Sequence, residues 1–273
     1  MDNIRIEPFR YKTIENEVGV LPAAGVSSRW NGTFKELLPI GENRWVIDSA
    51  IDALKKSLVS EIIIVSSPTK IQAHVEHFRK GKYKNLNIRF VIQYKPDGLL
   101  DAIKLAVNTA IDSRIYFAMP DTVISETAFG DASIKTIGYD SIYNLNLGYF
   151  YTNTPSRFGI INNIGERDGV LLTVPHYNFS TGDFINITRT TTWTVVDKPQ
   201  LPDSVDKYKA WGVASWDAHF THSLFTKNYK DLAEAFNDFN SNDCTTCGMY
   251  FLGSYTDFAS WKDYSKWVKE NTN

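Results

Sequence analysis

The sequence predicts an α/β protein of three layers, in which a mixed, mostly parallel central sheet lies between helices. In the first half of the 273-residue chain, short apolar runs alternate with segments whose apolar residues recur at helical spacing. The links between these segments are short, which is typical of βαβ units with parallel strands. The second half is richer in Thr, Tyr, Asn and Trp, and its segments of alternating polarity favour further strands.

The expected elements of the first half begin with an apolar run at 17–22, which a loop of small residues follows. Short apolar runs bounded by turn residues are typical of buried parallel strands. Apolar residues from Ile47 to Leu58 then recur at helical spacing and predict a helix over about 45–58. The same reasoning predicts strands at 61–66, 88–93 and 115–119 and helices at 71–78 and 99–110.

The second half continues the sheet without a linker, an internal repeat or a low-complexity run. We therefore expect a single domain over residues 1–273. The final helix is expected to pack on the outside of that domain. The pattern predicts strands at 148–152, 158–163, 192–197, 210–216 and 249–252 and helices at 231–239 and 261–270.

Composition excludes several classes of partner. The net charge is −2, so the basic excess typical of proteins that bind nucleic acid is absent. No stretch approaches the roughly 18 apolar residues of a membrane span, and the polar N-terminus lacks the apolar core of a signal peptide. We therefore expect a cytoplasmic protein without nucleic-acid or membrane partners. The only cysteines, Cys244 and Cys247, supply half of a zinc site at most, and we expect reduced thiols.

The loop after the first strand is a candidate phosphate site, because open parallel sheets bind ligands beyond the carboxyl ends of their strands. Small side chains let the backbone N–H groups of such a loop approach an anion closely. Arg29 adds a planar group of donors at the end of the loop. An ordinary tight turn remains the alternative. The small residues are Ala23, Ala24, Gly25, Ser27 and Ser28.

Two further candidates follow the first and fourth strands. Lys35 lies six residues beyond Arg29, within reach of a phosphate held by the loop, although most lysines are solvated surface residues. Asp121 follows Pro120 at the end of the fourth strand, where it fits either a metal ligand or an ordinary turn residue.

These motifs together resemble the sugar-1-phosphate nucleotidyltransferases, including the glucose-1-phosphate thymidylyl- and uridylyltransferases. The Ala-Ala-Gly-x-x-Ser-Arg loop is followed by Lys-Glu-Leu-Leu-Pro at 35–39, as in that family. Further matches run in the family's order, and together they cover the chain from about residue 18 to residue 258. They are Gln93–Leu99, Met119–Thr122, Arg157–Ile160, Val196–Pro199 and Ala210–Val213.

The resemblance implies a Rossmann-like, GT-A-like nucleotidyltransferase fold. It also implies a reaction in which an NTP, with dTTP or UTP favoured, and a sugar 1-phosphate give an NDP-sugar and pyrophosphate. Residues 1–125 would form the nucleotide-binding half and residues 126–273 the sugar-binding half. A homo-oligomer is possible, and the sequence does not identify the sugar.

Residue roles follow from the resemblance. The loop at 23–28 would hold the triphosphate, and Arg29, Lys35 and Lys198 would contact the reacting phosphates. Gln93 and Gly98 would contact the base. The resemblance implies sugar contacts by Gly159, Asp197 and Gly212 and a Mg²⁺ cofactor held by Asp121.

The chain also departs from the family pattern. Ser27 and Ser28 replace the usual Gly and Thr of the loop, and the gap between Arg29 and Lys35 is short. Phe251 stands where the family has a second metal-binding Asp, and Asp257 lies on the other side of the intervening glycine.

Two alternatives therefore stay open. One is a catalytically silent relative that binds a nucleotide or sugar nucleotide. The other is a CTP-dependent enzyme acting on a non-sugar phosphate. A substrate of this kind that carries a cation could bind in an aromatic box of Trp193, Trp211 and Trp216. Core packing also explains these rings.

Overall fold

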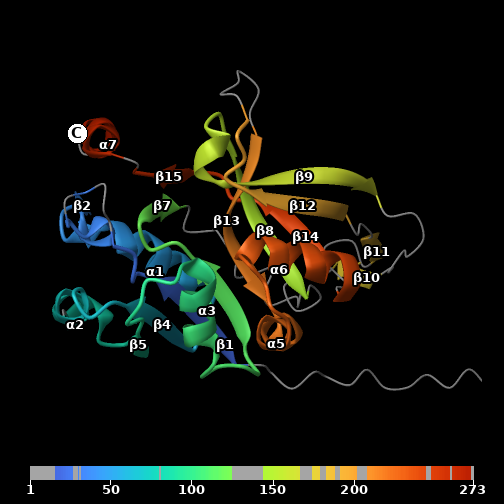
Figure 1. Cartoon of the computed structure of the whole chain (residues 1–273), viewed down its shortest axis with the longest axis horizontal. Coiled ribbons are helices and arrows are strands. Elements are labelled where there is room, and N and C mark those ends of the chain that lie inside the picture. Colours follow the sequence, from blue (N-terminus) through green and yellow to red (C-terminus); the bar gives the residue numbers. More distant parts are fainter. Residues whose placement is uncertain are drawn as a thin grey trace, which may run out of the picture.

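A nine-stranded sheet runs through both halves of the chain in the computed structural model (Figure 1). The structure describes residues 16–26, 30, 32–79, 81–124, 144–166, 174–178, 183–187, 191–201, 208–243, 247–258 and 260–271. Its α-helices are α1 (Val46–Lys56), α2 (Ile71–Phe78), α3 (Leu99–Val107), α5 (Ala218–Thr226), α6 (Leu232–Asp238) and α7 (Trp261–Asn271). None of the helices in these ranges is both long and apolar enough to cross a membrane.

The strands of the first half are β1 (Glu17–Pro22), β2 (Pro39–Gly41), β3 (Arg44–Trp45), β4 (Glu61–Ser66), β5 (Ile88–Ile92), β6 (Arg114–Ala118) and β7 (Thr122–Ile124). Those of the second half are β8 (Leu145–Thr152), β9 (Gly159–Glu166), β10 (Val174–Asn178), β11 (Asp183–Ile187), β12 (Thr191–Asp197), β13 (Tyr208–Trp216), β14 (Cys247–Phe251) and β15 (Tyr255–Asp257). Most of the predicted elements are therefore confirmed, with ends that differ by a few residues.

The large sheet is mixed, as the sequence predicts. Its strand order is β12-β9-β13-β6-β1-β4-β5, and β8 and β14 extend it from β13. The first-half strands pair in parallel, whereas β13 pairs antiparallel with β6, β8 and β9. Only β13 and β12 run against the other strands of this sheet, which confirms a mostly parallel arrangement.

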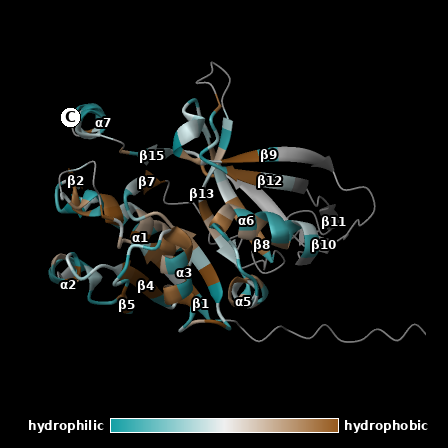
Figure 2. Cartoon of the chain, viewed as in Figure 1, coloured by the Kyte–Doolittle hydropathy of each residue, from teal (hydrophilic) through white to brown (hydrophobic). Residues whose placement is uncertain are grey.

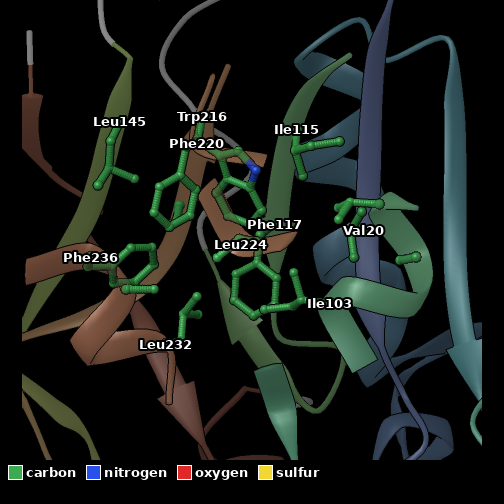
Figure 3. Close-up of a cluster of buried hydrophobic side chains, with 14 of the residues drawn as sticks. Val20, Ile103, Ile115, Phe117, Leu145, Trp216, Phe220, Leu224, Leu232 and Phe236 are labelled. Atoms are coloured by element: carbon green, nitrogen blue, oxygen red, sulfur yellow. The ribbon is translucent and has the colours of Figure 1, made fainter. Parts of the chain in front are cut away.

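Two apolar clusters cover the two faces of the sheet and make three layers. Neighbouring residues of a strand point to opposite faces. Accordingly, Val20 and Phe117 belong to the cluster under α3, α5 and α6, and Leu21 and Tyr116 belong to the cluster under α1. Figure 3 shows the first of these clusters, and in Figure 2 the strands between the helices are strongly hydrophobic.

The sequence pattern misses α5 and the short strand pairs β2–β3, β7–β15 and β10–β11. Helix α5 begins at Asp217, whose carboxylate accepts a hydrogen bond from the Phe220 N–H at 3.2 Å. This N-cap is visible in the sequence, but the helix is rich in Thr, His and Phe, which have modest helix propensity. Strands of two or three residues, as in the pairs β2–β3 and β7–β15, are too short to show an alternation of polarity.

A third, smaller apolar cluster holds the C-terminal segment against the first half. Trp30, Val46 and Phe258 are buried in it, and Tyr264 and Trp267 of α7 pack against them. No residue of α7 is itself buried, so this helix lies on the outside, as predicted (Figure 1). The cluster fixes β15, the strand before α7, beside β7.

Candidate active site

A cleft of about 450 Å³ lies at the carboxyl ends of the parallel strands. The loop from Pro22 to Val26 follows β1, Gln93 follows β5, and Met119–Asp121 follow β6, and all of them line this cleft. The N-terminus of α3 forms a further wall. This is the edge at which open α/β sheets bind ligands, as the sequence analysis expects.

Seven of the predicted site residues line this cleft together. The loop stays close to the sheet because the Ala23 N–H donates to the Val65 carbonyl oxygen at 2.7 Å. A Cβ atom added to Gly25 would have no neighbour within 4 Å, so the loop faces open space there. Ser27, Ser28 and Arg29 lie outside the described residues. The seven are Ala23, Ala24, Gly25, Lys35, Gln93, Gly98 and Asp121.

Lys35 joins two carboxylates at the wall of the cleft. Its Nζ lies 2.9 Å from Asp121 Oδ2 and 3.3 Å from Asp257 Oδ1. Burial alone would lower the pKa of Lys35, but the charges of Asp121 and Asp257 raise it above the usual value. The side chain of Lys35 is therefore a cation that is held in place, not a solvated surface lysine.

Asp257 also belongs to the site, although its place in the sequence does not match the family's second metal-binding Asp. It lies 136 positions beyond Asp121 (257 − 121), but β15 pairs with β7 so that Asp257 stands opposite Thr122. Arg157 Nη2 donates to Asp257 Oδ2 and, at 3.2 Å, to the Asp257 carbonyl oxygen. The pairing of two three-residue strands brings this carboxylate to the cleft, and no sequence motif signals it.

The carboxylates of this cluster have the chemistry of a divalent-cation site. Asp121 Oδ1 is buried and has no hydrogen-bond partner among the described residues, so it remains free to accept a ligand. Hard cations such as Mg²⁺ prefer carboxylate, phosphate and water oxygens. The described residues hold no group of three or more His, Cys, Asp or Glu side chains arranged for a metal ion. Asp121 and Asp257 therefore fit a cation whose other ligands are phosphate and water oxygens.

Phe251 contributes nothing of this kind. It lies in β14 and pairs with Tyr149 at the edge of the large sheet. The position at which the family has its second Asp therefore belongs to a different strand from Asp257. The carboxylate beside Asp121 comes instead from the strand that follows the Gly253 turn.

A buried polar cluster lies behind the loop and also went undetected in the sequence. Glu36 accepts hydrogen bonds from Lys70 Nζ at 2.9 Å and from His74 Nε2 at 3.0 Å. Lys70 Nζ also donates to the Ala23 carbonyl oxygen at 3.2 Å. Burial would raise the pKa of Glu36, but the His74 hydrogen bond and the Lys70 charge hold it below its usual value. This cluster ties the loop after β1 to the segment that carries Lys35.

The opposite end of the cleft is built around Gln93. Its Nε2 donates to the Gly98 carbonyl oxygen at 3.2 Å and to Asp101 Oδ2 at 2.8 Å. Gly98 has φ of +97°, a left-handed conformation that favours glycine, and the turn starts α3 directly beside Gln93. Gln93 and Gly98 therefore lie together, as the sequence analysis predicts.

The predicted residues of the second half lie near a neighbouring hollow of about 320 Å³, which shares Asp257 with the cleft. Asp197 pairs with Gly159, and the Lys198 N–H donates to the Phe158 carbonyl oxygen at 3.0 Å. Phe158 lines the hollow, whereas Asp197 and Lys198 are exposed and line neither cavity. These residues therefore lie beside the hollow, and Lys198 does not line the cleft that contains Lys35.

Gly159 and Gly212 each have a packing reason to be glycine. A Cβ atom at Gly159 would lie 2.2 Å from Trp211 Nε1, and one at Gly212 would lie 2.4 Å from Tyr255 Cε2. The aromatic rings therefore occupy the space that a side chain would need. The sugar contacts that the resemblance implies for these two glycines stay a prediction.

The three tryptophans of the suggested cation-binding box are core residues. Trp193 and Trp216 are almost completely buried, and Trp211 packs against the same apolar cluster. None of them lines the cleft or the neighbouring hollow. The aromatic content of the second half is therefore explained by packing.

The fold and the cleft define a class of protein. A doubly wound sheet whose carboxyl edge carries a loop of small residues, a held lysine and paired carboxylates is suited to bind phosphate groups together with a cation. Comparison with protein families is more specific. The chain belongs to the nucleotidyl transferase family, whose model matches residues 31–267. A comparison with curated proteins finds no match.

Solved structures share the fold over nearly the whole chain. A protein described as a glucose-1-phosphate thymidylyltransferase from Bacillus anthracis, in complex with sucrose, has 16% identity and a TM-score of 0.69, covering 94% of this chain and 96% of its own. A UTP-bound UGPase from Acinetobacter baumannii has 16% identity and a TM-score of 0.66, covering 93% and 92%. A UDP-glucose pyrophosphorylase complexed with UDP-glucose has 15% identity and a TM-score of 0.68, covering 93% and 97%.

Proposed function

We propose that this chain transfers a nucleotidyl group from an NTP, with dTTP or UTP favoured, to a sugar 1-phosphate. The products are an NDP-sugar and pyrophosphate. The observation that supports this proposal is the convergence of the small-residue loop, Lys35, Asp121 and Gln93 on one cleft. The structural relatives bear names of sugar nucleotide enzymes, which agrees with the proposal.

The chain's own residues have distinct tasks in this reaction. The backbone at 23–26 binds the triphosphate through N–H groups, and Gln93 and Gly98 contact the base. A phosphate oxygen of the sugar 1-phosphate attacks the α-phosphorus, the bond from that phosphorus to the bridging oxygen breaks, and pyrophosphate leaves with the bonding electrons. Catalysis is largely positioning and neutralisation of charge, because two anions must approach each other.

Lys35 supplies a positive charge where the two anions meet. The structure holds it on Asp121 and Asp257, and we propose that it contacts the reacting phosphates when these enter the cleft. Arg29, outside the described residues, has the same proposed task at the pyrophosphate. Asp121 and Asp257 would hold Mg²⁺, which supplies charge neutralisation at the phosphates when bound.

The sugar is proposed to bind in the second half, at the hollow that shares Asp257 with the cleft. Gly159, Asp197 and Gly212 are the proposed sugar contacts, and Lys198 the proposed contact of the sugar phosphate. This division gives the nucleotide to residues 1–125 and the sugar to residues 126–273. The shared position of Asp257 lets one cleft accept both substrates side by side.

A silent relative is the alternative that Phe251 favours. The position of Asp257 weakens that alternative, because the cluster has a second carboxylate although Phe251 cannot provide one. No observation remains that favours the CTP-dependent enzyme, since the tryptophans that suggested it are core residues.

The direct test is release of pyrophosphate in the presence of MgCl₂, with UTP, dTTP, CTP, ATP and GTP in combination with several sugar 1-phosphates. We expect release with UTP or dTTP and a loss of at least about 100-fold in Asp121→Asn, because the loss of this carboxylate would weaken the binding of Mg²⁺ and with it the neutralisation of charge at the reacting phosphates. Asp112→Asn is the matched control, because the Asp112 side chain is 85% exposed and does not line the cleft. Nucleotide binding without release from any pair of substrates would establish the silent relative instead.

The metal assignment has a separate test. In the presence of a nonhydrolysable UTP analogue, Asp257→Asn should bind Mn²⁺ about tenfold or more weakly than the wild type, since one of two carboxylate ligands is lost. Electron paramagnetic resonance measures free Mn²⁺ without relying on turnover. Equal Mn²⁺ affinity of the wild type and Asp257→Asn would remove Asp257 from the site.

A further inference from the structure

The amide of Gln93 is held in one orientation by two neighbouring groups. The side chain of Gln93 is 6% exposed and lines the cleft where β5 ends. Its nitrogen donates both to the Gly98 carbonyl oxygen at 3.2 Å and to Asp101 Oδ2 at 2.8 Å. Asp101 belongs to the first turn of α3, so the helix itself carries the partner that fixes this amide.

Chemistry decides which end of the amide faces these partners. A backbone carbonyl and a carboxylate can only accept hydrogen bonds, so the NH₂ group of Gln93 must be the end that points to them. The opposite orientation would place three acceptor oxygens against one another. The oxygen Oε1 is left as the atom that Gln93 offers to a ligand, and it has no hydrogen bond within the described part of the chain.

Gly98 adds a donor to the same cleft. Its carbonyl oxygen accepts from Gln93 Nε2, and its N–H makes no hydrogen bond to the residues that the structure describes. The site therefore presents an acceptor, Gln93 Oε1, and a donor, the Gly98 N–H, on two residues that are in contact. A base complementary to this pair has a ring N–H next to a carbonyl oxygen, as uracil and thymine have. Cytosine has an acceptor at the same ring nitrogen.

We propose that Asp101 is a positioning residue that holds Gln93 as an acceptor and thereby makes the cleft select uracil or thymine over cytosine. The proposal rests on the proposed function, because it assumes that the base binds at Gln93. It goes further by assigning the selectivity to a residue that does not itself line the cleft. To accept cytosine, Gln93 would have to turn its amide, and Oε1 would then face the Asp101 carboxylate.

Asp101→Asn tests the proposal with almost no change of shape. An asparagine amide can donate to Gln93 Oε1 as well as accept from Nε2, so it allows Gln93 to turn. We expect the ratio of UTP affinity to CTP affinity to fall about tenfold in Asp101→Asn, the fold-change of one hydrogen bond of about 1.4 kcal/mol. Asp97→Asn is the control in the same loop, because Asp97 is exposed and has no side-chain hydrogen bond to Gln93.

Isothermal titration calorimetry with UTP and CTP measures this ratio without any turnover. An unchanged ratio in Asp101→Asn, or equal affinity of the wild type for UTP and CTP, would overturn the positioning role. Failure of the proposed function looks different, since the ratio would still change although no pyrophosphate is released. Conversely, a wild type that releases pyrophosphate, together with an Asp101→Asn variant of unaltered ratio, would overturn only the role of Asp101.

Discussion

At the scale of single residues, the two carboxylates around Lys35 have the clearest chemical consequence. Its ammonium group lies between two carboxylates, 2.9 Å from Asp121 and 3.3 Å from Asp257, and its side chain is 14% exposed. A divalent cation at this place would have the same two carboxylates as partners, with Asp121 Oδ1 as the oxygen atom that Lys35 does not use. If Asp121 and Asp257 held a cation, Lys35 would lose part of its attraction to them and could turn toward other anions in the cleft, among which phosphate groups are the proposed ones.

Lys35→Met tests this competition through stability. Without the ammonium group, Asp121 and Asp257 repel each other, and we expect a loss of about 1–3 kcal/mol in the free energy of unfolding. Because a divalent cation can replace the lost charge, MgCl₂ should stabilise Lys35→Met more than the wild type. Thermal melting with and without MgCl₂ measures both effects.

Lys55→Met is the control for that experiment, since Lys55 is exposed on α1. An equal effect of MgCl₂ on Lys35→Met and Lys55→Met would contradict the account of two carboxylates that need a cation.

The residues of the cleft differ in how far the sequence predicts them. Lys35, Gln93 and Asp121 lie in motifs that follow strands, and the parallel arrangement of those strands then brings them to one edge. Asp257 does not follow from any motif, because its position depends on the pairing of β15 with β7. Lys70 was missed since its sequence surroundings match a surface helix start, whereas the structure buries it on Glu36.

At the scale of elements, one aromatic ring anchors β15 on the large sheet, in addition to the pairing of β15 with β7. Tyr255 stacks on Phe150 with ring centroids 4.0 Å apart and lies against Gly212 of β13. The ring therefore packs against two neighbouring strands of the large sheet. Since Asp257 is two residues further along β15, the packing of Tyr255 also sets the position of that carboxylate.

Gly212→Ala should disturb this packing. The new Cβ atom would lie 2.4 Å from Tyr255 Cε2, and Phe150 prevents the ring from moving away. We expect a loss of about 1–3 kcal/mol in the free energy of unfolding, the usual cost of overpacking. Urea unfolding measures it.

Gly81→Ala provides the comparison, because a Cβ atom at Gly81 would have no neighbour within 4 Å. If Gly212→Ala were as stable as Gly81→Ala, Tyr255 would not be confined in the way described.

Elements of the first half were predicted well because each buried strand and each amphipathic helix has a strong local pattern. Helix α1 illustrates this, since its apolar residues lie on one side, and the Asp48 carboxylate accepts a hydrogen bond from the Trp45 N–H at its start. The second half was predicted less completely. Its short strands and α5 depend on partners distant in the sequence, which local periodicity does not record.

At the scale of the whole molecule, a buried polar cluster links α1 to the segment after α2. Asp48 accepts hydrogen bonds from the Trp45 N–H at 2.8 Å, from Lys82 Nζ at 2.6 Å and from the Tyr83 hydroxyl. Burial would raise the pKa of Asp48, but the side chains of His77, Lys82 and Tyr83 lower it from 3.8 to about 2. The folded state therefore favours the charged carboxylate more than the unfolded chain does.

This shift has a defined effect on stability. A carboxyl group whose pKa is lower in the folded state stabilises it fully above the unfolded pKa of 3.8, and the stabilisation disappears as the pH falls through about 2. Because Lys82 is 36% exposed and partly screened by water, we expect a contribution of about 1–2 kcal/mol. The stability difference between the wild type and Asp48→Asn should therefore shrink between about pH 5 and about pH 2.

Urea unfolding at several pH values measures this difference. The exposed Asp112 again provides the control, and the differences for Asp48→Asn and Asp112→Asn are compared at each pH. A difference for Asp48→Asn that stays constant over the whole range would contradict the assigned pKa.

The pairing of strand β13 limits how the cleft can open for a substrate. It pairs with β6 of the first half from Val213 to Trp216 and with β8 of the second half along nearly its whole length. Separating the two halves along this line would break the ladder of hydrogen bonds between β13 and β6, at roughly 1 kcal/mol for each bond. The two halves are thus joined through one continuous sheet, and the side chains and turns at the rim of the cleft are the parts that can move without breaking it.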